Sequence, residues 1–316
     1  MPLQRLPASR FSYLGLPSSE WTEFSSKNAA IVPSLVGSPE HLRMIMKDLK
    51  VRAARLTKAI TEGLAVQDVQ VSTSDNSMIT VRVYDPELAQ KPCPVVLYIH
   101  GGGWTLGDLE GEDGTCRAMC VQCSVVVVSV DYRLAPEFPY PIGLNDCWDA
   151  LNWVSVPYLS SEQKAAVLTH RARDANLSIK GQVLRIPSLC HIHHYPPGLH
   201  IRSMEELKDG PLLLKKSMEL FYRYYNPPDP SDPSVSPLLS KDFSDLPRTY
   251  MQIAGMDPLR DEALAYVDKL IDAGVDVTVD IYPGLPHAFG YFPELPSAKK
   301  NTEDLCRGIS QIVAKD

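Results

Sequence analysis

The stretch Val95-Val-Leu-Tyr-Ile-His-Gly-Gly-Gly-Trp104 decides the fold of this chain. Its first five residues are apolar and favour extended structure, and such a run is typical of a central parallel strand buried on both faces. The run ends at Gly101, Gly102 and Gly103, where the backbone can turn sharply and bring bare N–H groups close to a bound atom. Converging N–H groups stabilise a negatively charged oxygen. The alternative is a glycine-rich turn without a ligand.

Strand-like and helix-like segments alternate along the rest of the chain. Residues 68–85 alternate between apolar and polar side chains around a Ser-Asp-Asn-Ser turn, which predicts an antiparallel hairpin. Further strands are predicted at 125–130, 182–186, 248–254 and 275–282. Helices are predicted at 111–123, 144–154, 164–174, 211–225, 260–273 and 299–314. This order predicts an α/β fold with a mostly parallel sheet and helices on both faces.

Composition limits the function classes. The 316 residues are within reach of one large α/β domain with insertions. A net charge of −7 gives no support to a nucleic-acid partner or to attachment to an anionic membrane. No apolar stretch approaches the roughly 18 residues of a membrane span, and the first residues lack the apolar core of a signal peptide. Seven cysteines without framework spacing suit a reducing compartment, so we expect a cytoplasmic protein.

An acid and a base follow two of the predicted strands. Asp257 and His287 come just after the strands at 248–254 and 275–282, on loops at the carboxyl edge of the sheet. Open α/β sheets build their sites at this edge. Each residue alone has a structural alternative, since Asp257 can cap a helix and His287 can be a turn residue. Asp261 fits the cap equally well. The order glycines, Asp, His resembles the α/β-hydrolase chain order, in which the oxyanion motif comes first and is followed by the serine, the acid and the histidine.

Four motifs in this order resemble the hormone-sensitive-lipase-like branch of the α/β-hydrolases, in its fungal carboxylesterase type. They are the segments 100–104 (His-Gly-Gly-Gly-Trp), 131–137 (Asp-Tyr-Arg-Leu-Ala-Pro-Glu), 255–262 (Gly-Met-Asp-Pro-Leu-Arg-Asp-Glu) and 282–289 (Tyr-Pro-Gly-Leu-Pro-His-Ala-Phe). The resemblance spans roughly residues 30–312. Four motifs in the family order make it highly specific.

The resemblance implies a sheet of about eight strands and hydrolysis of carboxylic esters with short or medium acyl groups, without a cofactor. Residues 1–65 would form N-terminal cap helices, and residues 66–316 the α/β-hydrolase domain with a cap insertion at about 187–237. By resemblance, Gly101 and Gly102 would donate to the oxyanion, Asp257 would be the triad acid and His287 the base. A small-molecule ester is the expected partner, and a homodimer is compatible with the sequence.

Four further features of the sequence bear on the predicted site. Trp104 follows the oxyanion glycines and lines an acyl pocket in one interpretation, or packs against the cap in the other. Ala288 stands where the family usually has Gly, beside the base. Cysteines at 116, 120 and 123 share a helix face, and histidines at 191, 193, 194 and 200 form a His-rich loop. We expect no metal at either place, because neither shows a complete ligand set.

The nucleophile motif of the family is missing. No Gly-x-Ser-x-Gly occurs in the chain, and the segment after Trp153 is shorter than the family pattern. Aligning the following helix with the family places the nucleophile position on Leu159, next to Ser160. The segment contains Pro157, which would lack a donor in a central strand. We therefore expect the central strand to be lost or irregular, with Ser160 as a tentative nucleophile.

Three interpretations stay open. In the first, the chain is a working esterase with an irregular elbow, acting by Ser-His-Asp acyl transfer in fungal secondary metabolism. In the second, it is a catalytically inactive or receptor-like relative that binds a small molecule, as the plant gibberellin receptors are. In the third, a wrongly assigned splice junction removed the elbow between Trp153 and Ala165, and the true product contains it. An in-frame Gly-x-Ser-x-Gly in the genomic DNA would establish the third.

Overall fold

The computed structural model describes residues 11–154, 157–161 and 163–314. Its centre is a sheet of eight strands in the order β1-β2-β4-β3-β5-β6-β7-β8. β1 pairs antiparallel with β2, and β2 antiparallel with β4, while the pairs from β4 through β3 to β8 are parallel. The strands are β1 (Leu64–Ser72), β2 (Met78–Pro86), β3 (Val95–Ile99), β4 (Val126–Asp131), β5 (Pro157–Ser161), β6 (Gln182–Arg185), β7 (Thr249–Met256) and β8 (Val277–Pro286).

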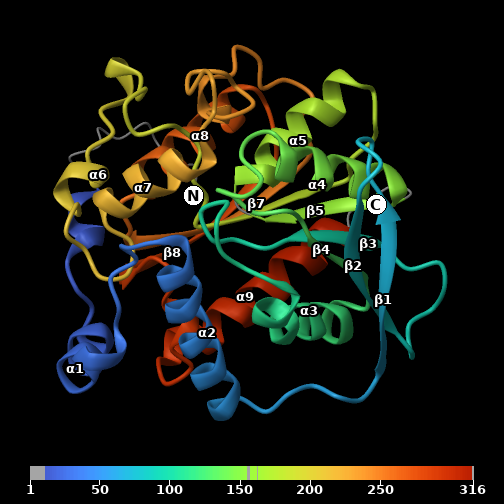
Figure 1. Ribbon diagram of the computed structural model, residues 1–316, viewed down its shortest axis with the longest axis horizontal. Helices are drawn as coiled ribbons and strands as arrows, with labels where there is room; N and C mark the ends of the chain where they lie inside the picture. Colours follow the sequence, from blue (N-terminus) through green and yellow to red (C-terminus); the bar gives the residue numbers. More distant parts are fainter. Residues whose placement is uncertain (1–10, 155–156, 162, 315–316) are drawn as a thin grey trace.

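Helices cover both faces of this sheet (Figure 1). Apolar side chains of α3 and α9 pack on one face, and those of α4, α5 and α8 on the other. The helices are α1 (Ser19–Asn28), α2 (Pro39–Leu56), α3 (Leu109–Cys123), α4 (Ile142–Trp153), α5 (Gln163–Asp174), α6 (Ser203–Glu206), α7 (Lys215–Tyr225), α8 (Arg260–Asp272) and α9 (Pro296–Val313). Short 3-10 turns are η2 (Ser12–Gly15), η3 (Ala29–Ile31), η4 (Pro197–Leu199), η5 (Pro237–Leu239) and η6 (Phe289–Tyr291). The α/β-hydrolase fold is confirmed.

A separate apolar cluster forms where α1, α2 and α7 meet the loops that follow β3 and β8. Arg43 of α2 fastens this region to the glycine-rich stretch. Its guanidinium donates to the carbonyl oxygens of Thr105 and Ala135, both at 3.2 Å, and to both carboxylate oxygens of Glu137, at 2.7 Å each. A planar guanidinium with two carboxylate contacts fixes orientation as well as distance. The N-terminal helices are thus tied to the loop that carries the glycines.

Strand β5 corrects one expectation. The prediction that the central strand is lost or irregular is wrong, because Pro157–Ser161 lies between β3 and β6. Tyr98 of β3 is opposite Ser160, which is also opposite Val183 of β6. Pro157 is the first residue of the strand, a position where a missing N–H is tolerated. β3 and β6 lie parallel to β5 and pair with it on both sides. The short and polar sequence of β5 does not by itself indicate a strand.

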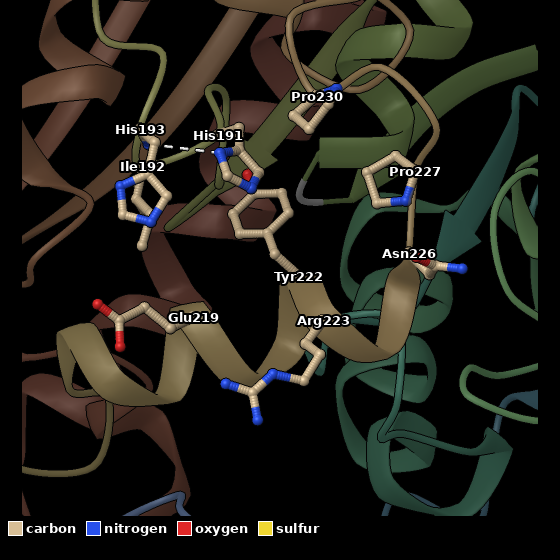
Figure 2. A pocket seen from close by; sticks show the side chains of 9 residues that line it. All are labelled: His191, Ile192, His193, Glu219, Tyr222, Arg223, Asn226, Pro227 and Pro230. Atoms are coloured by element: carbon tan, nitrogen blue, oxygen red, sulfur yellow. Dashed lines mark hydrogen bonds between the residues drawn. The ribbon is translucent and has the colours of Figure 1, made fainter.

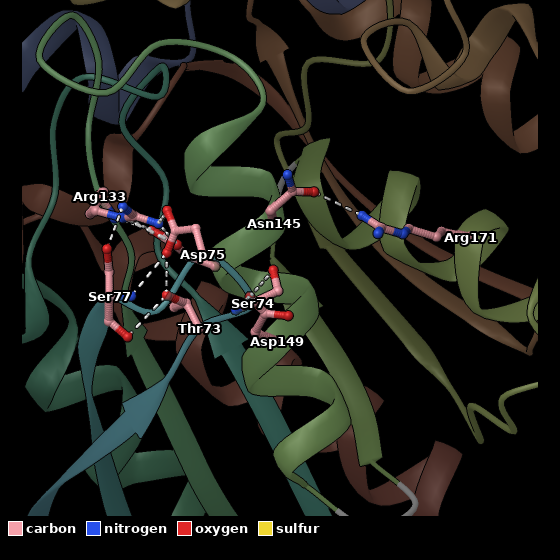
Figure 3. Close-up of polar contacts among 9 residues, drawn as sticks. Thr73, Ser74, Asp75, Ser77, Arg133, Asn145, Asp149 and Arg171 are labelled. Atoms are coloured by element: carbon pink, nitrogen blue, oxygen red, sulfur yellow. Dashed lines mark hydrogen bonds and ion pairs between the residues drawn. The ribbon is translucent and has the colours of Figure 1, made fainter.

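Polar contacts hold the hairpin turn between β1 and β2 against α4 and the loop after β4 (Figure 3). Arg133 donates to Asp75 at 2.8 Å and to the fully buried Asp146 at 2.6 Å. The hydroxyl and backbone N–H of Ser74 both donate to Asp149 on α4. A buried carboxylate is stable only when paired in this way. These contacts fix the segment at 131–137, which also reaches the glycine loop.

The cysteines of α3 and the histidine-rich loop are the two groups considered above for metal binding. Cys116 and Cys120 are buried on α3, while Cys123 is half-buried. Among residues 11–154, 157–161 and 163–314, no group of three His, Cys, Asp or Glu side chains is placed to hold a metal ion. Over the same ranges, no helix has both the length and the apolar character to cross a membrane.

Candidate active site

The predicted acid and base meet. Strand β7 ends at Met256 and β8 at Pro286, so Asp257 and His287 begin neighbouring loops at the carboxyl edge of the sheet. Nδ1 of His287 lies 2.7 Å from Oδ2 of Asp257, whose side chain is buried. A carboxylate can only accept here, so Nδ1 carries the hydrogen and Nε2 is the basic atom of the ring. This is the orientation of a general base.

The second carboxylate oxygen of Asp257 has the structural role of a residue that precedes a helix. Oδ1 accepts the backbone N–H of Leu259 at 2.9 Å, which closes the turn before α8. Asp261 is not the competing cap, because its carboxylate accepts the backbone N–H groups of Arg202 and Ser203 at 2.9 and 2.8 Å. Asp257 therefore holds its own loop with one oxygen and orients His287 with the other.

The base loop is strained at the residue after His287. Ala288 has a φ of 55°, in the left-handed region. A side chain costs about 1–2 kcal/mol in this conformation, and glycine does not. The preference of the family for Gly at this position thus has a backbone cause, and this chain tolerates the strain.

The glycine loop is built from three consecutive residues with positive φ: Gly102 at 121°, Gly103 at 57° and Trp104 at 62°. The carbonyl of Gly102 accepts the N–H of Leu106 at 2.9 Å, which closes the turn. A Cβ on Gly102 would lie 2.4 Å from the Leu106 carbonyl oxygen, and one on Gly103 would lie 2.6 Å from the Phe221 ring. Both positions therefore require glycine for space as well as conformation.

His100 orients the first glycine peptide. Its Nδ1 lies 2.9 Å from the carbonyl oxygen of Gly101, which can only accept, so Nδ1 carries the hydrogen. Its ring stacks on Tyr132 at 4.2 Å, and the Tyr132 hydroxyl donates to the His100 carbonyl. Burial lowers the pKa of His100 to about 3, so the ring is neutral. In a trans peptide, a Gly101 carbonyl held toward His100 directs the N–H of Gly102 to the opposite side.

The sheet order brings these parts to one edge. The glycine loop follows β3, the adjacent strand β5 carries Ser160 and ends at Ser161, and the acid and base loops follow β7 and β8. Ser160 lies within the ladder, one residue before the end of β5. The backbone thus places the serine pair beside the glycine loop at the edge where Asp257 and His287 meet.

Trp104 is packed against α7. Its indole is 5% exposed, stacks on Tyr225 at 4.4 Å and tilts against Tyr222 at 4.7 Å. Its Nε1 donates to Oε1 of Gln163 at 2.7 Å, and the Gln163 amide donates to the carbonyl of Val235. Gln163 is the first residue of α5, directly after the position where the family has its elbow. Trp104 is thus buried against α7. A role in substrate binding stays a prediction.

A pocket of about 340 Å³ opens between the His-rich loop and α7 (Figure 2). In its wall the ring of His191 faces that of Tyr222 at 4.2 Å, and burial lowers the pKa of His191 to about 4. The lining residues are His191, Ile192, His193, Glu219, Tyr222, Arg223, Asn226, Pro227 and Pro230. The Tyr222 ring that lines this pocket also contacts Trp104, at 4.7 Å between ring centroids.

Sequence reasoning missed Glu262, although it quoted the motif that ends there. This carboxyl on α8 is fully buried, accepts the N–H of Leu189 at 2.6 Å and the hydroxyl of Tyr195 at 2.5 Å, and so fastens the start of the cap insertion. Burial, with a smaller effect from the charge of Asp257, raises its pKa to about 8. The sequence around Glu262 does not indicate that this carboxyl is buried, because its burial depends on contacts with the distant loop that contains Leu189 and Tyr195.

Glu262→Gln is expected to remove a pH dependence of stability. Between the ordinary carboxyl pKa of about 4.3 and the folded value of about 8, the folded state binds more protons than the unfolded state. The free energy of unfolding contributed by Glu262 therefore falls as pH rises through this window and is lowest above pH 8. Urea unfolding at pH 5, 6.5 and 8 should show that the free energy of unfolding falls less steeply with pH in the Gln variant than in the wild type. The exposed Glu219→Gln is the control, and equal slopes in all three proteins would contradict the prediction.

Comparisons with known proteins agree with this geometry. A profile of the α/β hydrolase fold family matches residues 96–159 and 163–290, and the break falls where the elbow is missing. Esterase LipI of Mycobacterium tuberculosis is 38% identical over 257 residues, covering 73% of this chain and 76% of the relative. Versiconal hemiacetal acetate esterase of Dothistroma septosporum is 30% identical over 303 residues, covering 89% and 90%.

Among solved structures, vibralactone cyclase superposes with a TM-score of 0.86 at 30% identity, covering 96% of each chain. The profile match extends over more than half of the chain, and relatives named esterases align with most of its length. The chain therefore belongs to the α/β-hydrolase fold family, in its hormone-sensitive-lipase-like branch, and is a carboxylesterase-type hydrolase.

Proposed function

We propose that this chain hydrolyses carboxylic esters by acyl transfer to a serine of β5, with Asp257 and His287 as acid and base. The backbone N–H groups of Gly101 and Gly102 would be the oxyanion donors. The observation that carries the proposal is the 2.7 Å contact between His287 and Asp257 at the sheet edge that also bears the glycine loop. Three parts of one mechanism, far apart in sequence, share one edge.

The chemistry follows from this placement. Nε2 of His287 takes the serine proton as Oγ attacks the ester carbonyl, and the Asp257 carboxylate stabilises the imidazolium that forms. The glycine N–H groups stabilise the oxyanion of the tetrahedral intermediate. His287 then donates its proton to the departing alcohol, leaving an acyl-enzyme. Attack by a water molecule, again with His287 as base, releases the acid and restores the serine.

Ser160 is the proposed nucleophile, and Ser161 is the competing one. Ser160 is opposite Tyr98, so its backbone is level with β3 at a point two residues before His100. Ser161 is the last residue of β5 and lies nearer the turn into α5. Neither has the small flanking residues of a nucleophile elbow.

A binding protein without catalysis is the second candidate function. The observations that favour it are the missing Gly-x-Ser-x-Gly and the family match that stops at residue 159 and resumes at 163. In such a protein the glycine loop and His287 would hold a carbonyl group without a covalent step.

The test is covalent labelling together with turnover. The purified protein is treated with a fluorophosphonate, which phosphonylates an activated serine, and the labelled peptide is identified by mass spectrometry. Hydrolysis of p-nitrophenyl acetate and butyrate is measured in parallel for the wild type, Ser160→Ala and Ser161→Ala. Ser26→Ala on the exposed face of α1 is the matched control.

A label on residue 160 or 161, lost together with turnover in the matching variant, supports the esterase and names its nucleophile. Absence of both label and turnover, with a higher melting temperature in the presence of p-nitrobutyranilide, would favour the binding protein. The amide is a suitable probe because it presents a carbonyl in the shape of the ester but resists hydrolysis.

The substrate class we propose is a short-chain ester, such as an acetate, of a fungal secondary metabolite. Support comes from the resemblance to the fungal type and from the relative named versiconal hemiacetal acetate esterase. A cytoplasmic location and a homodimer remain predictions from the sequence.

A further inference from the structure

Two tyrosines from distant parts of the chain donate to one carboxylate. The hydroxyl of Tyr98, in β3, lies 2.8 Å from Oε2 of Glu112 on α3. The hydroxyl of Tyr291, in η6, lies 2.9 Å from Oε1 of the same side chain. An ionised carboxylate only accepts, so both phenols are donors and each oxygen of Glu112 receives one of them.

These tyrosines belong to the two loops of the proposed mechanism. Tyr98 is two residues before His100, in the strand that leads directly into the oxyanion glycines. Tyr291 is four residues after His287, in the turn that follows the base. The Glu112 side chain thus connects Tyr98, in the strand before the proposed oxyanion glycines, directly with Tyr291, in the turn after the proposed base.

The surroundings strengthen this link. Tyr98 is 3% exposed, and burial raises its pKa well above the usual range, so its phenol stays a donor. Arg185, the last residue of β6, donates to the Tyr98 hydroxyl at 3.3 Å and to Oδ1 of Asn301 at 3.1 Å. The guanidinium adds positive charge beside the carboxylate in a region where water screens it little.

We propose that Glu112 is a positioning residue that sets the oxyanion loop and the base relative to each other. The proposal rests on the esterase function proposed above. A glutamine at position 112 keeps the volume but has one acceptor oxygen in place of two and carries no charge. One phenol must then accept from the amide N–H instead of donating, and both links lose the strength that the carboxylate charge gives them. Small misplacements of catalytic groups are expensive in rate, since about 1 Å can cost on the order of 100-fold.

The experiment compares Glu112→Gln, Tyr98→Phe and Tyr291→Phe with a matched control. Tyr84→Phe is that control, because the Tyr84 hydroxyl donates to Asp113 on the same helix at 3.0 Å but β2 carries no catalytic loop. With p-nitrophenyl butyrate, the three test variants should lose about tenfold in kcat with little change in KM. Tyr84→Phe should keep kcat even if its melting temperature falls.

A double-mutant cycle and a spectroscopic readout complete the test. Glu112→Gln combined with Tyr291→Phe should lose less than the product of the single losses, because both substitutions act on the same hydrogen bond. The pKa of His287, followed by NMR of ¹⁵N-labelled histidines, should shift in Tyr291→Phe and stay at the wild-type value in Tyr84→Phe. This measurement needs no turnover, so it tests Glu112 even if ester hydrolysis fails.

Wild-type kcat and an unmoved His287 titration in Glu112→Gln and Tyr291→Phe would overturn the proposal. A kcat loss of equal size in Tyr84→Phe would overturn it as well, because the effect would then be one of general stability. Should the Gln variant fail to fold, the two Phe variants keep their rings and leave both outcomes measurable.

Discussion

His287→Ala is expected to lower kcat for p-nitrophenyl butyrate by at least about 10⁴-fold, the largest loss of any single substitution outside β5. The ring has its Nδ1 2.7 Å from the buried Asp257, so it is held in the tautomer that leaves Nε2 basic. Removing it leaves a serine whose ordinary hydroxyl is a weak nucleophile. Steady-state kinetics at pH 8 measure the loss, with residual catalysis from the oxyanion donors alone.

Two further variants are measured beside His287→Ala. Asp257→Asn keeps the shape of the contact but favours the wrong tautomer, so a loss of about 10³–10⁴-fold is expected. His194→Ala, in the exposed His-rich loop, is the matched control and should keep wild-type turnover. Turnover by the His287 variant at close to the wild-type rate would show that any nucleophile is activated by another group. Circular dichroism of each variant excludes loss of fold as the cause.

Gly102→Ala is expected to lower kcat by about 10²–10³-fold, the loss typical of removing one oxyanion donor. A methyl group there would lie 2.4 Å from the carbonyl oxygen of Leu106, and the φ of 121° is unfavourable for any side chain. The loop must therefore move, and its N–H groups no longer converge on the oxyanion. KM should change less than kcat, because the lost contact forms mainly in the transition state.

Gly114→Ala is the matched control for this substitution. It lies in α3, where an added Cβ meets nothing within 4 Å, and alanine favours the helix. Its kcat should equal that of the wild type, with an equal or higher melting temperature. If Gly102→Ala retained full kcat, the glycine loop would not be the oxyanion hole, whatever the role of His287.

Much of the site was predictable because its signals are local. The apolar run at 95–99 and the glycines after it predict a buried strand and a tight turn, and the structure has both. Asp257 and His287 each follow a strand directly, and parallel strands bring their carboxyl ends to one edge. The order of elements therefore predicts that both residues lie at this edge, and the structure adds their 2.7 Å contact.

Strand β5 was not predictable for the opposite reason. Pro157–Ser161 has little β-favouring character of its own, and its ladder is supplied by β3 and β6 on either side. Trp104 is a similar case, because its burial depends on Tyr225 and Gln163, which are distant in sequence. Propensity reports what a segment prefers alone, and tertiary contacts override it.

The sequence by itself determined the fold class, the glycine turn, and the acid and base in their family order, since each is written in a few consecutive residues. Only the tertiary structure decided that β5 is present, that Glu262 is buried, and that Glu112 joins β3 to the turn after His287. These depend on where separate segments meet. A carboxylate that accepts from two distant tyrosines leaves no periodic pattern in the chain.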